Sequence, residues 1–284
     1  MRANVIAVKI DCGAADERCS TTTGVYVAIR NRIANQLQNG ARRLTAYLPS
    51  AQSIEKFQSE LDDVRDKIGD TRMERLFANH QGPQLLKWLH YLPIYERHFS
   101  PYREVGSVSL LELGVYRGGS LKLWREYFGP ASQVFGIDID PACARFDGDY
   151  GSVRIGSQAD PDFLQGVVQE MGGIDIVIDD GSHVMKHIKA SFETLFPLLS
   201  DGGLYVVEDL HTAYWPSFGG GYRSRRSFIE TAKGLVDDMH HWYHRRAASQ
   251  PFAKDQVAAV HFYDSMIVFE KRKVERPTSV MVGG

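Results

Sequence analysis

The sequence has few cysteines, almost no net charge and no long apolar run. Three cysteines in 284 residues are too few for a disulfide framework or a four-ligand zinc site, so we expect a reducing, cytoplasmic setting. The formal net charge of -2 gives no electrostatic attraction to nucleic acid or to an anionic membrane. No apolar stretch approaches the roughly 20 residues of a membrane span. These absences give no reason to expect a nucleic-acid-binding, membrane-spanning or disulfide-rich protein, and the composition is ordinary for a globular one.

Strand patterns alternate with helical patterns through most of the chain. We expect strands at 108–113, 133–139, 153–155, 174–178 and 204–207, and helices at 84–98, 121–128, 161–171, 184–199 and 228–245. This alternation is typical of a parallel sheet covered by helices on both faces. Two further strands, at 257–263 and 266–271, are separated only by Asp264 and Ser265, so the sheet should finish with an antiparallel strand.

The first 78 residues differ from the rest because they carry no catalytic pattern. Two helices are expected there, at 25–48 and 53–68, with Ser53 as the N-cap of the second. We therefore predict a helical appendage over 1–78, which serves oligomer contacts or covers the site as a lid, and a catalytic domain over 79–284.

Two acidic pairs follow two neighbouring strands of the predicted sheet. Asp179 and Asp180 come directly after the fourth strand, and Glu208 and Asp209 after the fifth. The carboxyl ends of parallel strands line the crevice in which open α/β sheets bind ligands. Four carboxylates there repel each other unless a cation lies among them. An all-oxygen set favours a hard cation such as Mg²⁺, and His183 lies three residues after Asp180.

A glycine-rich turn links the first strand to the helix that follows it. Its residues of interest are Glu112, Gly114, Tyr116, Gly118 and Ser120. The spacing is not that of dinucleotide binders, and Glu112 would repel a pyrophosphate, which argues against a nicotinamide oxidoreductase. Asp138 ends the second strand, where a carboxylate can bind both ribose hydroxyls. A nucleoside with an amino acid tail and no phosphate fits both features, and S-adenosylmethionine is such a molecule.

Taken together, these segments resemble the class I S-adenosylmethionine-dependent methyltransferases. The resemblance covers roughly residues 80–272. It implies a Rossmann-like α/β fold with a seven-stranded, mostly parallel sheet and an antiparallel C-terminal strand. The segments 177–183 and 207–220, the second of which contains Thr-Ala-Tyr-Trp-Pro, are similar to the Mg-dependent macrolide-sugar O-methyltransferases of mycinamicin and tylosin biosynthesis.

The resemblance implies a role for each candidate site residue. It assigns the metal ligands to Asp180, Glu208 and Asp209, and the general base to His183. Because some relatives use an aspartate as the base, that alternative stays open. The expected cofactor contacts are Glu112, Gly114, Tyr116, Gly118, Ser120, Asp138, Gln158 and Asp179.

The leading interpretation is an O-methyltransferase that uses S-adenosylmethionine and Mg²⁺. Its acceptor would be a sugar hydroxyl of a glycosylated natural product or glycolipid. A catechol or phenolic acceptor also offers two adjacent oxygens to a metal, and a non-catalytic assembly protein that binds S-adenosylmethionine is a third possibility. We expect a small-molecule glycoside and further copies of the chain as partners, with no nucleic acid and no membrane span.

Overall fold

A computed structural model describes residues 59–104 and 106–283 of the chain. All of these described residues belong to one compact unit. The helix expected at 25–48 and the expected N-cap Ser53 lie outside the described residues. Among the described residues, we find no helix that combines the length and the hydropathy of a membrane span.

Seven strands form one sheet in the order β3-β2-β1-β4-β5-β7-β6. They are β1 (Ser109–Leu113), β2 (Gln133–Asp138), β3 (Ser152–Ile155), β4 (Ile174–Asp179), β5 (Leu199–Val207), β6 (Val257–Tyr263) and β7 (Met266–Lys271). The first five strands pair in parallel, and β7 lies antiparallel to both β5 and β6. The predicted sheet is therefore confirmed. Its strand order reverses between β1 and β4, the position at which open sheets bind ligands.

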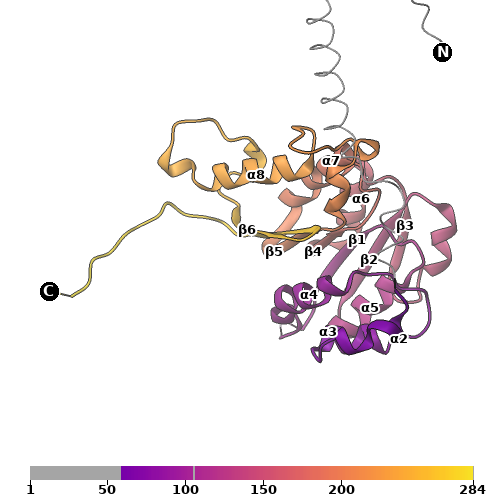
Figure 1. Cartoon of the computed structure of the whole chain (residues 1–284). Coiled ribbons are helices and arrows are strands. Elements are labelled where there is room, and N and C mark those ends of the chain that lie inside the picture. The colour runs from indigo at the N-terminus through magenta and orange to yellow at the C-terminus, as the bar shows by residue number, and fades with distance from the viewer. Residues whose placement is uncertain (1–58, 105, 284) are drawn as a thin grey trace, which may run out of the picture. The chain divides into compact units, whose positions relative to one another are not determined.

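Helices cover both faces of this sheet (Figure 1). One face carries α6 (Pro161–Met171), α7 (Met185–Leu195) and α8 (Phe228–Met239), and the other carries α3 (Arg72–Ala78), α4 (Leu92–Phe99) and α5 (Gly119–Phe128). Successive strand residues alternate between the two cores: Val177 packs in the first and Ile178 in the second. Apolar packing on both faces explains why the parallel strands are almost continuously apolar.

Most predicted helices are observed, some with shorter bounds. Helix α6 has the predicted bounds, and the side chain of its N-cap Asp160 accepts hydrogen bonds from the N–H groups of Asp162 and Phe163. The helix predicted at 84–98 is wrong in its first half. Residues 84–88 are not helical, a 3-10 turn covers Leu89–Tyr91, and α4 begins only at Leu92. The non-helical segment delivers two side chains to the ligand crevice.

Candidate active site

A large cavity lies at the carboxyl ends of the parallel strands. Its volume is about 1260 Å³. Predicted residues that line it are Gly114, Tyr116, Ser120, Asp138, Gln158, Asp180, His183, Glu208 and Asp209. The fold therefore brings the glycine-rich turn and three of the four paired acids to one cavity, although they come from three different strand ends.

The glycine-rich turn is shaped by close backbone packing. Gly114 has a φ of 100°, and a Cβ placed on it would overlap the backbone carbonyl oxygen of Asp180. Only glycine fits this position without moving one of the two chain segments. Gly118, with a φ of 76°, is the N-cap of α5, and a Cβ placed on it would overlap the Phe146 ring. Gly118 therefore shapes the turn and is not among the described residues that line the cavity.

The Asp138 carboxylate organises the turn from the neighbouring strand. Its Oδ2 accepts hydrogen bonds from the N–H groups of Val115 (3.0 Å) and Tyr116 (2.9 Å), and its Oδ1 accepts one from Asp140 (2.9 Å). Burial would raise the pKa of Asp138, but the backbone donors lower it below its usual value. An ionised carboxylate is thus held beside the cavity, where ribose hydroxyls are expected.

Glu112 lies beneath the cavity wall. Its carboxylate is fully buried and accepts hydrogen bonds from Ser120 Oγ (2.6 Å) and Trp124 Nε1 (3.0 Å). Burial raises its pKa to about 7, against the opposing effects of Lys87, Ser120 and Trp124. Ser120 lines the cavity, whereas Glu112 is not among the described residues that line it. Glu112 can therefore act on a ligand only indirectly, through its hydrogen bond with Ser120.

Asp179 is also enclosed, and it anchors a residue that does line the cavity. Its Oδ1 accepts a hydrogen bond from Gln158 Nε2 (3.0 Å), and its Oδ2 accepts from Ser191 Oγ (2.5 Å) and Tyr205 OH (3.1 Å). The Gln158 Oε1 in turn accepts from the N–H of Ser182 (2.6 Å). In the described chain Asp179 is not part of the cavity lining, so its effect on a cofactor would pass through Gln158.

A buried lysine joins the two acidic pairs, and the sequence interpretation missed it. Lys87 Nζ donates to Asp180 Oδ2 (2.6 Å) and to Glu208 Oε2 (2.8 Å), and it lies 3.9 Å from Glu112 Oε1. The Lys87 side chain is only 2% exposed. Burial would lower the pKa of Lys87, but the three carboxylates raise it well above its usual value. Lys87 therefore remains charged and offsets part of the negative charge.

Glu208, one of the three predicted metal ligands, is almost completely buried. Both of its carboxylate oxygens already have donors, because Tyr95 OH binds Oε1 (2.5 Å) and Lys87 binds Oε2. Burial and the nearby Asp180 carboxylate raise the pKa of Glu208 well above its usual value, with Lys87 acting in the opposite direction.

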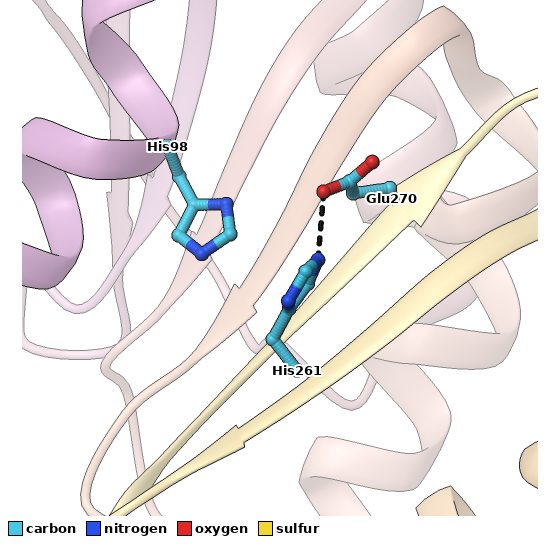
Figure 2. A group of neighbouring side chains, drawn as sticks. All are labelled: His98, His261 and Glu270. Atoms are coloured by element: carbon cyan, nitrogen blue, oxygen red, sulfur yellow. Dashed lines mark hydrogen bonds and ion pairs between the residues drawn. The ribbon is translucent and has the colours of Figure 1, made fainter.

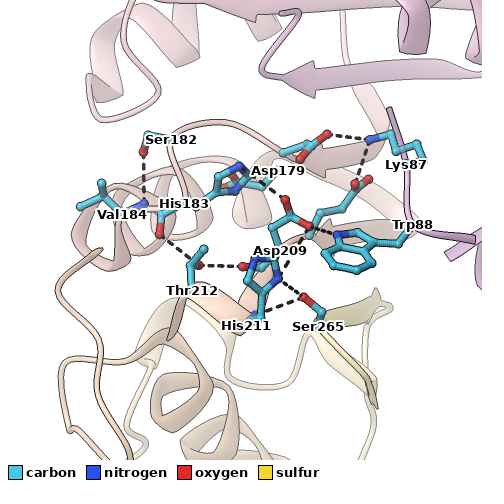
Figure 3. Close-up of polar contacts among 12 residues, drawn as sticks. Lys87, Trp88, Asp179, Ser182, His183, Val184, Asp209, His211, Thr212 and Ser265 are labelled. Carbon is cyan, nitrogen blue, oxygen red and sulfur yellow. Dashed lines mark hydrogen bonds and ion pairs between the residues drawn. The ribbon is translucent and has the colours of Figure 1, made fainter. Parts of the chain in front are cut away.

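Asp209 lines the cavity and is fixed by two aromatic side chains, one of which, Trp88, is shown in Figure 3. Its Oδ1 accepts hydrogen bonds from Trp88 Nε1 (3.0 Å) and Tyr91 OH (3.0 Å). Tyr91 also contacts the carbonyl oxygen of Ser265 (3.0 Å), in the turn between β6 and β7. The second oxygen of Asp209, Oδ2, lies 3.8 Å from His183 Nε2. One carboxylate oxygen is thus bound by the aromatic side chains, and the other faces His183.

Backbone strain accompanies the two residues that face each other here. His183 has a φ of 56° and Asp209 a φ of 53°, both in the left-handed region that side chains other than glycine rarely adopt. Such conformations cost of order 1–3 kcal/mol and cluster at functional sites. One atom each from Asp180, His183 and Asp209 lie within 4.8 Å of one another, which is a plausible metal-binding group.

Comparison with known proteins gives a consistent family. A family model described as a methyltransferase domain matches residues 111–210, from β1 to just past the second acidic pair. Among solved structures, the MycE methyltransferase of the mycinamycin biosynthetic pathway, in complex with Mg, SAH and mycinamycin VI, superposes with a TM-score of 0.65 and 30% identity. That match covers 80% of this chain and 63% of the other. The chain belongs to the class I S-adenosylmethionine-dependent methyltransferases.

Curated methyltransferases are similar to this one over the same region. A tetracenomycin-C rhamnosyl 3'-O-methyltransferase from Streptomyces olivaceus is 43% identical over 209 residues, which are 69% of this chain and 53% of that enzyme. Demethylmacrocin O-methyltransferase from Streptomyces fradiae is 38% identical, over 65% of this chain and 50% of that enzyme. The chain thus spans about half the length of the curated relatives it matches.

Proposed function

We propose that this methyltransferase transfers a methyl group from S-adenosylmethionine to a sugar hydroxyl of a glycosylated natural product, with Mg²⁺ as a cofactor. The observation that carries the proposal is the single cavity in which the glycine-rich turn and Asp138 lie beside Asp180, His183 and Asp209. The similar enzymes that methylate sugars of tetracenomycin-C and mycinamycin-type compounds support the choice of acceptor.

The cofactor would lie against the glycine-rich turn. Gly114 has no Cβ where the turn meets the Asp180 carbonyl, Asp138 offers an ionised carboxylate for the ribose hydroxyls, and Gln158 is held in place by Asp179. S-adenosylmethionine supplies the electrophilic methyl group when bound. Glu112 and Ser120 stabilise the wall that faces its amino acid end.

The divalent cation would lie on the other side of the cavity. Asp180 and Asp209 each have a carboxylate oxygen close to a ring nitrogen of His183, and carboxylate oxygens are ligands that suit Mg²⁺. Glu208 would complete the expected ligand set only if Lys87 moved away from its Oε2. When bound there, Mg²⁺ would supply the positive charge that makes an acceptor hydroxyl easier to deprotonate.

His183 is proposed as the general base. Its Nδ1 is buried and, in the described part of the chain, has no hydrogen-bond partner, while its Nε2 faces Asp209. In this proposal the imidazole takes the acceptor proton as the acceptor oxygen attacks the methyl group, and the Asp209 carboxylate, 3.8 Å from Nε2, stabilises the positive charge that results. The remaining contribution of the protein is alignment and exclusion of water. An aspartate base, Asp180 or Asp209, is the alternative that the His183 variant tests.

Methyl transfer to a glycoside with a vicinal diol, measured with and without EDTA, tests the proposal. We expect activity to require Mg²⁺ and to be lost in Asp180→Asn, with S-adenosylmethionine binding retained by calorimetry. Full activity in EDTA would rule out the metal, and a preference for catechols over glycosides would rule out the sugar acceptor. Binding of the cofactor with no transfer to any acceptor would favour an assembly protein. A homo-oligomer and a cytoplasmic location also stay predictions.

A further inference from the structure

A second group of metal-ligand side chains lies outside the cavity, where α4 packs on the hairpin of β6 and β7. It consists of His98 from α4, His261 from β6 and Glu270 from β7, with the ring of His98 turned toward the other two (Figure 2). One ligand atom from each lies within 4.8 Å of the other two. His98 therefore lies beside two residues that are more than 150 positions further along the chain.

The local contacts prepare these side chains as ligands. His261 Nε2 lies 2.7 Å from Glu270 Oε1, and the His98 and His261 rings are 4.7 Å apart. The hydroxyl of Tyr263 lies 2.9 Å from His98 Nε2 and fixes the orientation of that ring. Histidines that bind metals usually have such an outer hydrogen-bond partner.

We propose that His98, His261 and Glu270 form a site for a transition-metal ion, with Zn²⁺ as its best representative. Two imidazoles and one carboxylate are a set that zinc uses in proteins, and imidazole favours zinc over Mg²⁺. With metal–ligand bonds of about 2.0–2.1 Å, tetrahedral ligands lie roughly 3.4 Å apart. His261 Nε2 and Glu270 Oε1, now 2.7 Å apart, would separate slightly to admit the ion, and the other ligand distances, all within 4.8 Å, would adjust by small side-chain rotations.

The site is open enough to admit an ion and buried enough to hold it. His98 is 8% exposed, whereas the side chains of His261 and Glu270 are 28% and 38% exposed. The ion would enter from the side of the hairpin and leave one position for water. It would also clamp α4, the helix that carries Tyr95 to Glu208, against the C-terminal hairpin. The role we infer is therefore structural support of the acceptor side of the cavity.

Zinc binding to full-length protein by calorimetry tests the proposal. The Asp180→Asn variant serves as the background, because Asp180 belongs to the group of ligand atoms in the cavity. We expect one tightly bound Zn²⁺ in that background and a rise in Tm on its addition. Adding His261→Gln or Glu270→Gln should weaken binding by more than about 100-fold, since loss of an outer partner alone costs about 10–100-fold. Tyr263→Phe should weaken it by about 10-fold.

A control histidine and a spectroscopic measurement make the outcome decisive. His240 bonds the Val236 carbonyl at the end of α8, away from the cluster, so His240→Gln should leave zinc binding unchanged. Co²⁺ should give the visible absorption of a tetrahedral site in the background and lose it in His261→Gln. If no ion binds, or if His261→Gln and Glu270→Gln retain the affinity, the cluster is only a hydrogen-bonded pair beside a packed histidine.

Discussion

Lys87 Nζ lies 2.8 Å from Glu208 Oε2, although the two residues are 121 positions apart in the chain. Both side chains are almost completely enclosed, at 2% and 1% exposure. A buried ion pair is costly to break because the remaining partner keeps an uncompensated charge. Lys87 thus stabilises the negative side of the cavity in the absence of any added cation.

The variant Lys87→Met should destabilise the metal-free chain by about 3 kcal/mol, because Glu208 and Asp180 lose their shared donor. Mg²⁺ or Mn²⁺ should stabilise this variant more than the parent chain, since both carboxylates become free to bind the ion. Urea denaturation with and without the metal measures both effects. Lys189→Met is the matched control: it removes an exposed pair with Glu193 (3.6 Å) and should change stability by less than about 0.5 kcal/mol. Equal metal effects in Lys87→Met and the parent would contradict the prediction.

Replacement of His183 should separate catalysis from binding. His183→Gln removes the proposed base while a polar side chain remains beside Asp209. We expect kcat to fall by about 10²–10⁴-fold, with little change in S-adenosylmethionine affinity. Steady-state kinetics and calorimetry give the two quantities, and His240→Gln provides the reference. Unchanged kcat would transfer the role of base to an aspartate.

Gly114, in the turn after β1, should not tolerate any side chain. In Gly114→Ala the new Cβ would overlap the Asp180 carbonyl at a φ of 100°, so the turn or the β4 end must move. We expect a loss of stability and weaker S-adenosylmethionine binding, both seen in thermal unfolding with and without the cofactor. Gly166→Ala is the control in helix α6, where a Cβ meets open space. It should stabilise the chain by roughly 0.5–1 kcal/mol.

The buried Glu112 carboxyl should make stability depend on pH. Its pKa is raised by burial to about 7, compared with about 4.5 for an ordinary glutamate. Between these values the folded chain keeps a proton that the unfolded chain has lost, so stability is fully present below about pH 4.5 and falls as pH rises through 7. The slope from one proton is at most about 1.4 kcal/mol per pH unit. Glu112→Gln should flatten this part of the profile in urea denaturation at pH 5, 6, 7 and 8, and an unchanged slope would assign the effect to other groups.

The sequence was sufficient to predict the sheet and the positions of the acidic pairs. Parallel strands end at one edge, so Asp180 and Asp209 had to meet there once the strands were recognised. The sequence was not sufficient for Lys87, which lies between Leu86 and Trp88 in a segment whose apolar pattern predicts a covering helix. Its partners lie far along the chain, and no local pattern marks them.

The orientation of acidic side chains was also beyond the reach of the sequence. Glu112 and Asp179 were expected to contact the cofactor, yet both are held beneath the cavity wall by hydroxyl, amide and indole donors from the covering helices and adjacent loops and strands. Which face of a strand end turns toward the crevice depends on twist and on packing partners. Only the assembled sheet and its helices determine that.

The contact between Tyr91 and the turn at Ser265 joins positions 174 residues apart. The cofactor side of the cavity, in contrast, is built largely from residues between Glu112 and Ser182, which are closer together in the chain. Non-local contacts of this kind form late in folding and are lost early when a terminus loosens. We therefore expect the two halves of the cavity to be completed at different stages of folding, because the acceptor side depends on the docking of the β6–β7 hairpin and the pocket for the methyl donor does not.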